Sequence, residues 1–442
     1  MTRKETIARE VAARLRNAGH IAYFAGGCVR DRLLGREPGD FDIATDATAE
    51  RVQQLFPRTV PVGAQFGVVL VLADDETFEV ATFRADDAYI DGRHPVSVRF
   101  SSPEEDAQRR DFTINGMFID PVDDRVIDHV GGRADLAAGV IRAIGNAADR
   151  IREDRLRMLR GIRFAARFGY VIAPPTFAAI RSAAHSITDI AWERIGDEII
   201  RMLTEADGAR TKRAFELLDE SGLLAQVLPE ILALKGVEQS PDYHPEGDVF
   251  VHTLGLLERF DGRQTETLAL GALLHDIAKP RCAERAQDRI TFHGHCELGA
   301  EMAITICQRL RCSRETWERV QYLVRSHLRL VNAPQMRLST LKRFLAEDGI
   351  EELLELARLD ALASSGDLTY YDFCRRKLEE LGQEEIKPEP LLRGRDLIDL
   401  GFDPGPQFGE ILGAVSEAQL DGNLKSKEEA IAWVRGRFRD RS

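Results

Sequence analysis

Apolar residues at the start of the chain follow a helical period and then a strand pattern. Ile7, Val11 and Leu15 recur at every fourth position, which predicts an amphipathic helix that ends near Gly19. A second helix is predicted from about Thr48 to Phe56. Four short apolar runs predict strands, namely Ile21–Ala25, Phe41–Ala44, Val68–Leu72 and Phe78–Phe83. This alternation is typical of an α/β domain.

Strand-like patterns nearly vanish beyond about Ile151, and the helical period takes over. Two segments that contain proline and glycine interrupt the helical part, Ser240–Phe250 and Glu384–Asp396. We therefore predict the α+β class, since a chain of 442 residues has room for several domains. The predicted parts are an α/β head (1–145), an all-α neck (146–239), a helical domain (240–383) and a helical tail (384–442).

The composition favours a cytoplasmic protein. Hydrophobic residues make up 44% of the chain, which is enough for buried cores, yet no apolar run approaches the roughly 20 residues of a membrane span. The start, MTRKETIARE, lacks the apolar segment of a signal peptide. The six cysteines include no CxxC pair, which favours reduced thiols. We expect no membrane partner.

The net charge of −13 disfavours a nucleic-acid partner at first sight, but the charge is unevenly distributed. Between Arg150 and Tyr170 there are seven arginines against two acids, Glu153 and Asp154. A basic stripe on an acidic protein can bind a polyanion, while the remaining surface repels unspecific contacts. The alternative is a solvated charged helix.

The stretch GGCVRDRLLGREPGDFDIATDAT, which begins at Gly26, is the most informative part of the sequence. The pair Gly26 and Gly27 precedes Arg30, and Asp40 and Asp42 follow with one residue between them. Alternate side chains of a strand project from the same face. Carboxylates bind hard cations, and a glycine turn lets the backbone approach a phosphate closely. The pattern predicts a site for Mg²⁺ and a nucleoside triphosphate.

A third carboxylate usually completes such a site, and Glu79 is the best candidate. It lies in a later predicted strand whose apolar neighbours, Phe78 and Val80, point the other way. A solvent-facing strand acid is an equally good interpretation. With Asp40 and Asp42 it would form a catalytic site that holds two Mg²⁺ ions.

Five motifs in order resemble those of the class II tRNA CCA-adding enzymes and bacterial poly(A) polymerases, in the polymerase-β superfamily. They are the stretch above, RRDFTING (109–116), DHVGGRADL (128–136), REDRLRMLRGIRFAARFGY (152–170) and WERIGDEI (192–199). Gly116 stands where the family usually has a small residue such as alanine, and Arg155 where it usually has proline. The resemblance implies a polymerase-β-like nucleotidyltransferase head and places Arg110 near the nucleotide. Alternatively, Arg109 or Arg110 pairs with an acid at 104–106.

The resemblance also implies a nucleotide-selecting helix at 152–170. Asp154 and Arg157 are three residues apart and would share a helical face, with Arg160 and Arg163 further along. Aspartate accepts and arginine donates hydrogen bonds, which matches the pairing edges of cytosine and adenine and repels those of uracil and guanine. We therefore expect these residues to bind the nucleotide and select its base. A surface ion pair of small energetic value is the alternative.

Residues 84–100 form a long, polar and turn-rich segment. In CCA-adding relatives a flexible loop lies here and is required for the switch from C to A addition. The resemblance therefore disfavours an enzyme that adds only C.

An ordered series of histidines and aspartates in the second half resembles the HD metal-phosphohydrolase superfamily. Its members are His252, His275, Asp276, His295, His327 and Asp360. Imidazole and carboxylate ligands suit a transition metal such as Ni, Mn or Co. The neighbouring His293 is a weaker candidate than His295. A degenerate HD-type helical domain, in which the histidines only pack, is the alternative.

Together these features predict template-independent addition of C, C and A to the 3′ end of tRNA, from CTP and ATP with Mg²⁺. An A-only tRNA nucleotidyltransferase or a poly(A) polymerase stays open. So does an HD-type phosphohydrolase that acts on RNA 3′ ends or nucleotides. A regulatory RNA-binding protein with an inactive head is disfavoured by the intact Asp40 and Asp42. The sequence makes no prediction of the oligomeric state.

Overall fold

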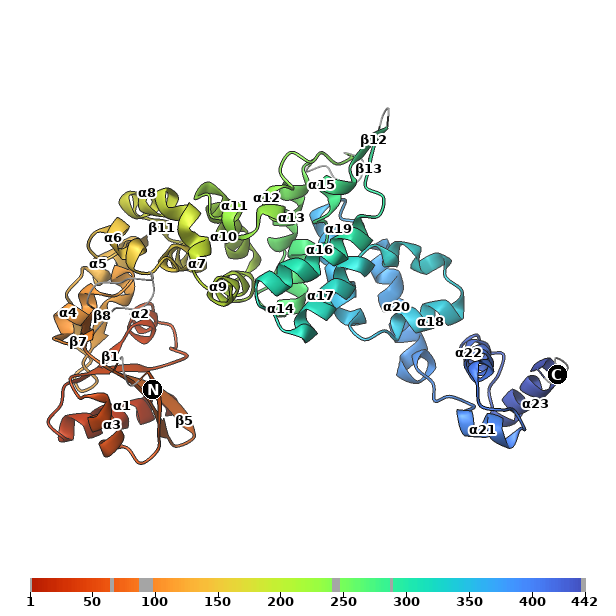
Figure 1. The fold of residues 1–442 in the computed structure, drawn as a ribbon, viewed down its shortest axis with the longest axis horizontal. Helices are drawn as coiled ribbons and strands as arrows, with labels where there is room; N and C mark the ends of the chain where they lie inside the picture. The colour runs from red at the N-terminus through yellow and green to blue at the C-terminus, as the bar shows by residue number, and fades with distance from the viewer. Residues whose placement is uncertain (1, 64–66, 87–97, 241–246, 287–288, 439–442) are drawn as a thin grey trace. The chain divides into compact units, whose positions relative to one another are not determined.

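A computed structural model of the chain describes residues 2–63, 67–86, 98–240, 247–286 and 289–438 (Figure 1). These residues form two compact units. The first comprises Met1–Leu232 with Arg309–Arg311, and the second comprises Ala233–Gln308 with Cys312–Ser442. The expected order of a strand-containing part followed by helices is confirmed. The finer division into four parts stays a prediction.

A seven-stranded mixed sheet lies in the first unit, in the strand order β3-β4-β5-β2-β1-β8-β9. Its strands are β1 (Ala22–Ala25), β2 (Asp42–Thr45), β3 (Thr59–Gly63), β4 (Val68–Ala73), β5 (Glu76–Thr82), β8 (Met117–Ile119) and β9 (Val126–Asp128). Only β2 and β5 pair in parallel, among the pairs of this sheet. The four predicted strands are present as the consecutive neighbours β4, β5, β2 and β1. The sequence did not predict β3, which contains Pro61. The proline is tolerated there because β3 lies at the edge of the sheet.

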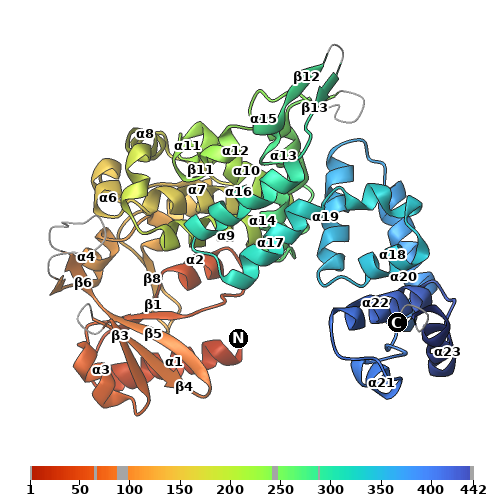
Figure 2. The same cartoon turned by 45° about the vertical axis from the view of Figure 1, so that its right-hand side comes forward.

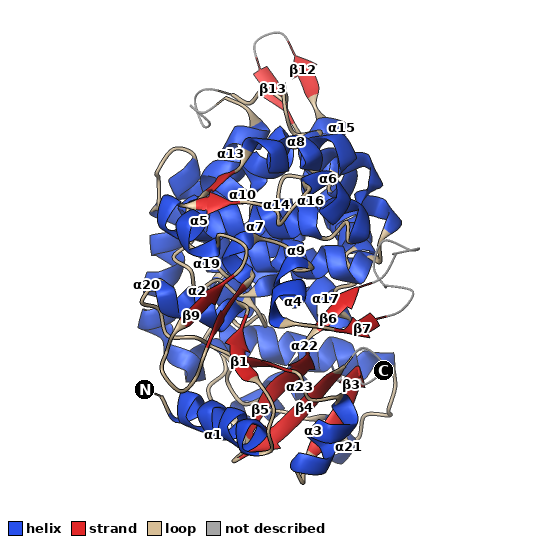
Figure 3. Cartoon of the chain, turned by 90° about the vertical axis from the view of Figure 1, so that its left-hand side faces the viewer, coloured by secondary structure: helices blue, strands red, loops and turns tan. Residues whose placement is uncertain are grey.

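The predicted N-terminal helices are α1 (Arg3–Asn17) and α3 (Ala49–Leu55), which pack against the sheet and against each other (Figure 3). Gly19, at φ +90°, follows α1 in the left-handed region that favours glycine. The sheet buries an aromatic cluster, in which Phe83 and Phe118 meet edge to face at 5.8 Å. This packing holds the ends of β1 and β2 in place beside the segment that precedes β8.

The remaining elements of the first unit are mostly helical. The helices are α2 (Gly27–Leu33), α4 (Pro103–Gln108), α5 (Gly132–Ala138), α6 (Ala147–Glu153), α7 (Arg157–Phe168), α8 (Pro174–Ala183), α9 (Trp192–Thr204), α10 (Gly208–Glu220), α11 (Leu224–Val227) and α12 (Pro229–Leu232). Two short strand pairs accompany them, β6 (Arg84–Asp86) with β7 (Val98–Phe100), and β10 (Val140–Ile141) with β11 (Val171–Ile172). The centre of the predicted C-to-A loop, residues 87–97, lies outside the described residues.

The second unit is helical apart from one hairpin, within the residues that the structure describes. Its helices are α13 (Val249–Leu257), α14 (Glu266–Leu274), α15 (Lys279–Cys282), α16 (His295–Arg309), α17 (Arg314–Ser326), α18 (Leu338–Leu345), α19 (Ile350–Ala363), α20 (Thr369–Ile386), α21 (Gly394–Asp399), α22 (Pro406–Leu420) and α23 (Lys427–Phe438). The hairpin of β12 (Glu284–Ala286) and β13 (Arg289–Thr291) projects beyond α15 (Figure 2). A separate apolar cluster, including Leu397, Ile411 and Val434, joins the last three helices. No described helix is both long and apolar enough to span a bilayer.

Candidate functional sites

A glycine turn connects β1 to α2 at the first predicted site. Gly26 precedes the helix with φ +70°, a conformation that side chains other than glycine rarely adopt. A Cβ at this position would lie 3.4 Å from Nη1 of Arg110 and 3.5 Å from Oδ2 of Asp42. Gly26 therefore keeps open the space between an arginine and a carboxylate.

Asp42 and Glu79 are neighbours across the only parallel strand pair of this sheet. Ile43 of β2 is opposite Val80 of β5 in this parallel pair, so the preceding residues, Asp42 and Glu79, also lie side by side. Both acids line a cavity of about 210 Å³. Burial, followed by the nearby charge of Glu79, raises the pKa of Asp42 to about 6. Glu79 itself is exposed, as the alternative interpretation required. A divalent cation fits beside the two carboxylates, because its positive charge would favour the ionised form of Asp42.

Asp40 is placed differently from its prediction. β2 begins at Asp42, so the expectation that both aspartates lie within one strand is wrong for Asp40. Asp40 is instead bound by Lys4, whose Nζ donates to the carbonyl of Gly39 at 2.7 Å and to Oδ1 of Asp40 at 2.8 Å. The side chain of Asp40 is 88% exposed, although its charge still contributes to the raised pKa of Asp42.

A second cavity, of about 440 Å³, brings together every residue predicted to bind the nucleotide. Its lining includes Asp42 together with Gly26, Gly27, Arg30, Arg110, Asp154, Arg157, Arg160 and Arg163. Across the whole lining, eight arginines face three aspartates. Such an excess of positive charge suits a polyphosphate. The cavity is also lined by Arg109, Arg167 and Arg201, which the sequence analysis did not assign to the nucleotide.

Acidic or amide partners hold several of these arginines in place. Arg30 is buried and donates to Oδ1 of Asn115 at 2.7 Å. Arg160 contacts Asp111 at 2.7 Å, and Arg163 contacts Glu198 at 2.7 Å. Burial alone would raise the pKa of Asp111, but Arg160, together with hydrogen bonds from the backbone N–H of Phe112 and from Asn115, holds that pKa below its usual value. The arginines are therefore positioned before any ligand binds.

Arg110 combines the two interpretations that the sequence left open. It lines both cavities, and it also donates to Oδ2 of Asp106 at 2.9 Å, as the alternative required. Arg109 contacts the other oxygen of Asp106 at 2.8 Å. Burial would raise the pKa of Asp106, yet the two arginines lower it below its usual value. Asp106 thus anchors a pair of arginines at the cavity wall.

The predicted nucleotide-selecting helix is interrupted at Asp154. This residue is extended, with φ −143° and ψ 104°, between α6 and α7, so the shared helical face with Arg157 is wrong. Oδ1 of Asp154 accepts a hydrogen bond from the backbone N–H of Leu156 at 3.1 Å. Aspartate side chains that bond to the local backbone in this way compete with helix formation.

The side chains of Asp154 and Arg157 bind to other residues and not to each other. Asp154 accepts two hydrogen bonds from Arg194 of α9, at 3.2 and 2.9 Å. Arg157 donates to Glu153 and to the backbone carbonyl of Arg109, each at 2.8 Å. The sequence did not identify Arg194, although it lies within the WERIGDEI motif. Both predicted residues nevertheless line the same cavity.

The six predicted HD residues converge in the second unit. They come from α13 (His252), the end of α14 (His275 and Asp276), the start of α16 (His295), the end of α17 (His327) and α19 (Asp360). Asp276 lies at the centre, with Oδ2 3.1 Å from Nε2 of His275 and Oδ1 3.5 Å from Nε2 of His295. Nε2 of His252 lies 3.0 Å from Oδ1 of Asp360. His293, the weaker candidate, is exposed, and it lies outside the two groups of possible metal ligands that the described residues form.

The donor chemistry of this cluster fits a metal. Nδ1 of His275, His295 and His327 each lies 2.7–2.9 Å from a backbone carbonyl three residues earlier. This contact orients each ring and leaves Nε2 for a cation, as in metal-binding histidines. Burial, then the charge of His275, lowers the pKa of His327 to about 4, which keeps that ring neutral. Neutral imidazoles and ionised aspartates are the forms that bind a metal.

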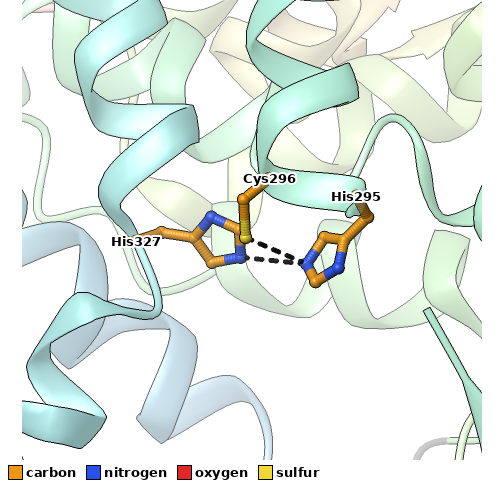
Figure 4. Close-up of side chains that lie close together, drawn as sticks. All are labelled: His295, Cys296 and His327. Atoms are coloured by element: carbon orange, nitrogen blue, oxygen red, sulfur yellow. Dashed lines mark hydrogen bonds between the residues drawn. The ribbon is translucent and has the colours of Figure 1, made fainter. Parts of the chain in front are cut away.

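Cys296 is a further candidate ligand that the sequence did not single out. It forms a group with His295 and His327 whose ligand atoms lie within 4.8 Å of one another (Figure 4). A second group of this kind consists of His252, His275 and Asp360. Burial, followed by the charges of Glu297 and Asp276, raises the pKa of the Cys296 thiol to about 12. The sequence could have identified Cys296 as a possible ligand, because it directly follows His295.

Three family models match the chain. The poly A polymerase head domain matches residues 22–142, the probable RNA and SrmB-binding site of polymerase A matches residues 169–234, and the HD domain matches residues 249–364. These matches cover the head motifs, part of the neck and the histidine series. The HD cluster lies within the third matched segment, whereas the nucleotide cavity lies only partly within the first, because residues 143–168 fall between the first two matches.

Known proteins match the chain over most of its length. The CCA-adding enzyme of Bacillus cytotoxicus is 46% identical over 95% of this chain and 95% of its own. The match to the CCA-adding enzyme of Bacillus subtilis is 43% identical and spans 48% of this chain, about half (52%) of that relative. The solved structure of the Bacillus stearothermophilus CCA-adding enzyme in complex with CTP covers 100% of this chain and 99% of its own, at 28% identity and TM-score 0.66. The chain therefore belongs to the CCA-adding enzymes, a family of tRNA nucleotidyltransferases.

Proposed function

We propose that the first unit adds C, C and A to the 3′ end of tRNA, using CTP and ATP. The observation that carries this proposal is the single arginine-rich cavity that contains Asp42 and all eight predicted nucleotide-binding residues. Its positive charge suits the triphosphate and the RNA end. The related enzymes are named CCA-adding enzymes, and a cytoplasmic location is part of this proposal.

In this proposal Asp40, Asp42 and Glu79 hold Mg²⁺, which supplies charge to activate the 3′-hydroxyl and to stabilise the leaving pyrophosphate. Gly26 and Gly27 let the backbone approach the phosphates, and Arg30 and Arg110 neutralise them. Each arginine is already oriented, Arg30 by Asn115 and Arg110 by Asp106. Little of the nucleotide's binding energy is then spent on ordering these side chains.

In this proposal Asp154, which lies between α6 and α7 and is bound by Arg194, helps to select the base. Asp154 accepts hydrogen bonds only, and Arg157 and Arg194 donate only. Together they match the amino group and the ring nitrogen on the pairing edge of cytosine or adenine, whereas uracil and guanine present the reverse pattern. Asp154→Ala should therefore let UTP and GTP be added, while triphosphate binding falls little. A variant that still excludes both nucleotides would contradict this role.

The experiment supplies each nucleotide in turn to purified protein with tRNA lacking CCA, tRNA ending in CC, or an unrelated RNA. We expect two C residues and then one A on the first tRNA, and one A on the second. Addition of A alone to the second tRNA only would indicate an A-only enzyme. Long A tails on every RNA would indicate a poly(A) polymerase.

Asp40→Ala and Asp42→Ala test the metal ligands in the same assay. Both should reduce addition to below about a tenth of wild type even in excess Mg²⁺, because each removes a carboxylate ligand. Asp123→Ala is the matched control, since Asp123 is exposed on the same unit and should leave the rate unchanged. Retained activity in either of the first two variants contradicts the two-metal site.

A second function is proposed for the HD cluster, which would hydrolyse phosphate esters near RNA 3′ ends with a transition metal. The specific observation is that Asp276, His295, His327 and Asp360 line a cavity of about 330 Å³, so the cluster is accessible to a ligand. Lys279, beside Asp276 at 2.6 Å, provides a positive charge at the same wall. Phosphatase and cyclic phosphodiesterase assays with Ni²⁺, Mn²⁺ and Co²⁺ test it. No turnover with any of these metals, while tRNA addition is active, would leave a structural domain.

A further inference from the structure

A cavity of about 360 Å³ in the second unit adjoins the HD cluster but is formed mainly by other residues. Two members of the cluster, His327 and Asp360, belong to its wall. The rest of the wall comes from the short 3-10 helix η4 (Arg329–Gln335) and the residue before it, from α19, and from the start of α20 with the segment that precedes it. The nucleotide addition proposed for the first unit uses none of these residues.

Large apolar side chains are exposed at this cavity. Leu328 is 42% exposed, Val331 43% and Tyr370 38%, and Tyr371 follows Tyr370 in the same wall. Exposed apolar groups that gather in one place mark a surface that a ligand or partner covers. A tyrosine ring offers a flat face on which any nucleobase can stack. The cavity also has the size of a small-molecule site, which is typically about 300–1,000 Å³.

The charged residues of this cavity indicate which part of a ligand it accepts. Its described lining contains two acids, Asp360 and Asp367, but no lysine or arginine. Asp367 is fixed in place, because its Oδ1 accepts a hydrogen bond from the backbone N–H of Thr369 at 2.9 Å. A phosphate would be repelled by these carboxylates. The faces of a base would not be repelled, and a base amino group can donate a hydrogen bond to a carboxylate.

The cavity that contains Lys279 meets this one at the HD cluster. The two cavities share His327, Leu328 and Asp360 as lining residues. Lys279 supplies a positive charge to the other cavity, where its Nζ lies 2.6 Å from Oδ2 of Asp276. An aromatic compartment and a cationic compartment therefore adjoin the same cluster. This combination fits a ligand that carries an aromatic ring at one end and an anion at the other.

We propose that Tyr370 and Tyr371 form a binding site for the nucleobase of a nucleoside phosphate whose phosphate reaches the HD cluster. The base stacks on a tyrosine ring and contacts Leu328 and Val331, and the phosphate lies toward Lys279. This inference rests on the hydrolysis proposed for the HD cluster. It restricts the substrate from phosphate esters in general to those of a nucleoside, either free or at the 3′ end of an RNA.

Photolabelling with 8-azidoadenosine tests the site without any hydrolysis. The full-length protein is labelled in EDTA, and trypsin releases Tyr370 and Tyr371 together in the peptide 359–375. We expect label on this peptide, suppressed by excess adenosine but not by excess ribose. Tyr370→Ala should reduce the label at least about fivefold, which is the lower end of what stacking one base on an aromatic ring contributes. Tyr370→Phe is the matched control and should retain the label, because the face of the ring is unchanged.

A peptide 359–375 without label overturns the proposal, and so does label that adenosine fails to suppress or that persists fully in Tyr370→Ala. The competition in the wild type decides by itself if Tyr370→Ala fails to fold. A short RNA with a 3′-phosphate that suppresses labelling at a lower concentration than adenosine 3′-phosphate assigns the site to RNA ends, and the reverse order assigns it to free nucleotides.

Kinetic assays with Ni²⁺, Mn²⁺ or Co²⁺ separate this proposal from the hydrolysis on which it rests. Tyr370→Ala should raise the KM for adenosine 3′-phosphate at least about fivefold and leave the KM for glycerol phosphate, which has no base, unchanged. Turnover of both substrates without adenosine-sensitive label would keep the hydrolysis and overturn the base site. Adenosine-sensitive label without turnover would keep the base site and overturn the hydrolysis.

Discussion

Asp42→Asn should stabilise the metal-free protein and at the same time abolish nucleotide addition. The carboxyl of Asp42 is shielded from water and lies near the charges of Glu79 and Asp40, which makes its ionised form unfavourable without a cation. Asparagine has almost the same shape and no charge. A residue kept for metal binding at the expense of stability would behave in this way.

The size of the effect follows from the pKa of Asp42, which rises from its ordinary value of 3.8 to about 6. A difference of this size corresponds to roughly 3 kcal/mol at a pH well above both values. Because Asp42 borders a cavity and is partly solvated, we expect a gain of about 1–3 kcal/mol in the free energy of unfolding at pH 8.

The pH dependence gives this prediction its sign. The folded state binds the proton of Asp42 more tightly than the unfolded state, so this group stabilises the fold most at low pH. That contribution is lost as the pH rises from about 4 through 6. The advantage of Asp42→Asn over wild type should therefore be roughly half as large at pH 5 as at pH 8.

Differential scanning calorimetry in EDTA, at pH 5 and pH 8, measures the effect. The transition of the first unit is the one that CTP or ATP shifts upward in the wild type. Asp40→Asn is the matched control, because the same chemical change at a side chain that is 88% exposed relieves only the smaller effect of Asp40 on Asp42 and should bring a much smaller gain. The reasoning is refuted if Asp42→Asn is no more stable than wild type at pH 8, or if Asp40→Asn gains as much.

Three further substitutions test the packing around the nucleotide cavity. Gly116→Ala should cost about 1–3 kcal/mol of stability, because its Cβ would lie 2.7 Å from Val130, and adding Val130→Ala should recover part of that loss in thermal unfolding. Arg155→Pro should raise the free energy of unfolding by about 0.4–1 kcal/mol, since Arg155 occupies the first central position of a turn, where proline is favoured; a lower melting temperature would contradict this. Arg163→Met should cost about 3–5 kcal/mol because it leaves Glu198 buried without its partner, and a double variant with Glu198→Leu should recover most of it in denaturant titrations.

Local sequence patterns predicted the helices and strands whose formation depends on neighbouring residues in the chain. The four predicted strands are adjacent members of the observed sheet, and the predicted helices α1 and α3 lie within a few residues of their expected bounds. The family motifs also identified residues that line one cavity. They could do so because proteins that share these motifs in the same order share the fold that brings them together. Strand β3 escaped prediction since Pro61 is disfavoured within a sheet unless the strand is at its edge.

The sequence by itself determined the α+β class, the family and the residue types at both sites, since these depend on composition, period and motif order. Only the tertiary structure decided that Asp42 is shielded while Asp40 pairs with Lys4, that Asp154 binds Arg194 forty residues away, and that Cys296 joins the histidines. Burial, charge pairing and ligand geometry depend on segments far apart in the chain, and local periodicity carries no information about which of them will meet.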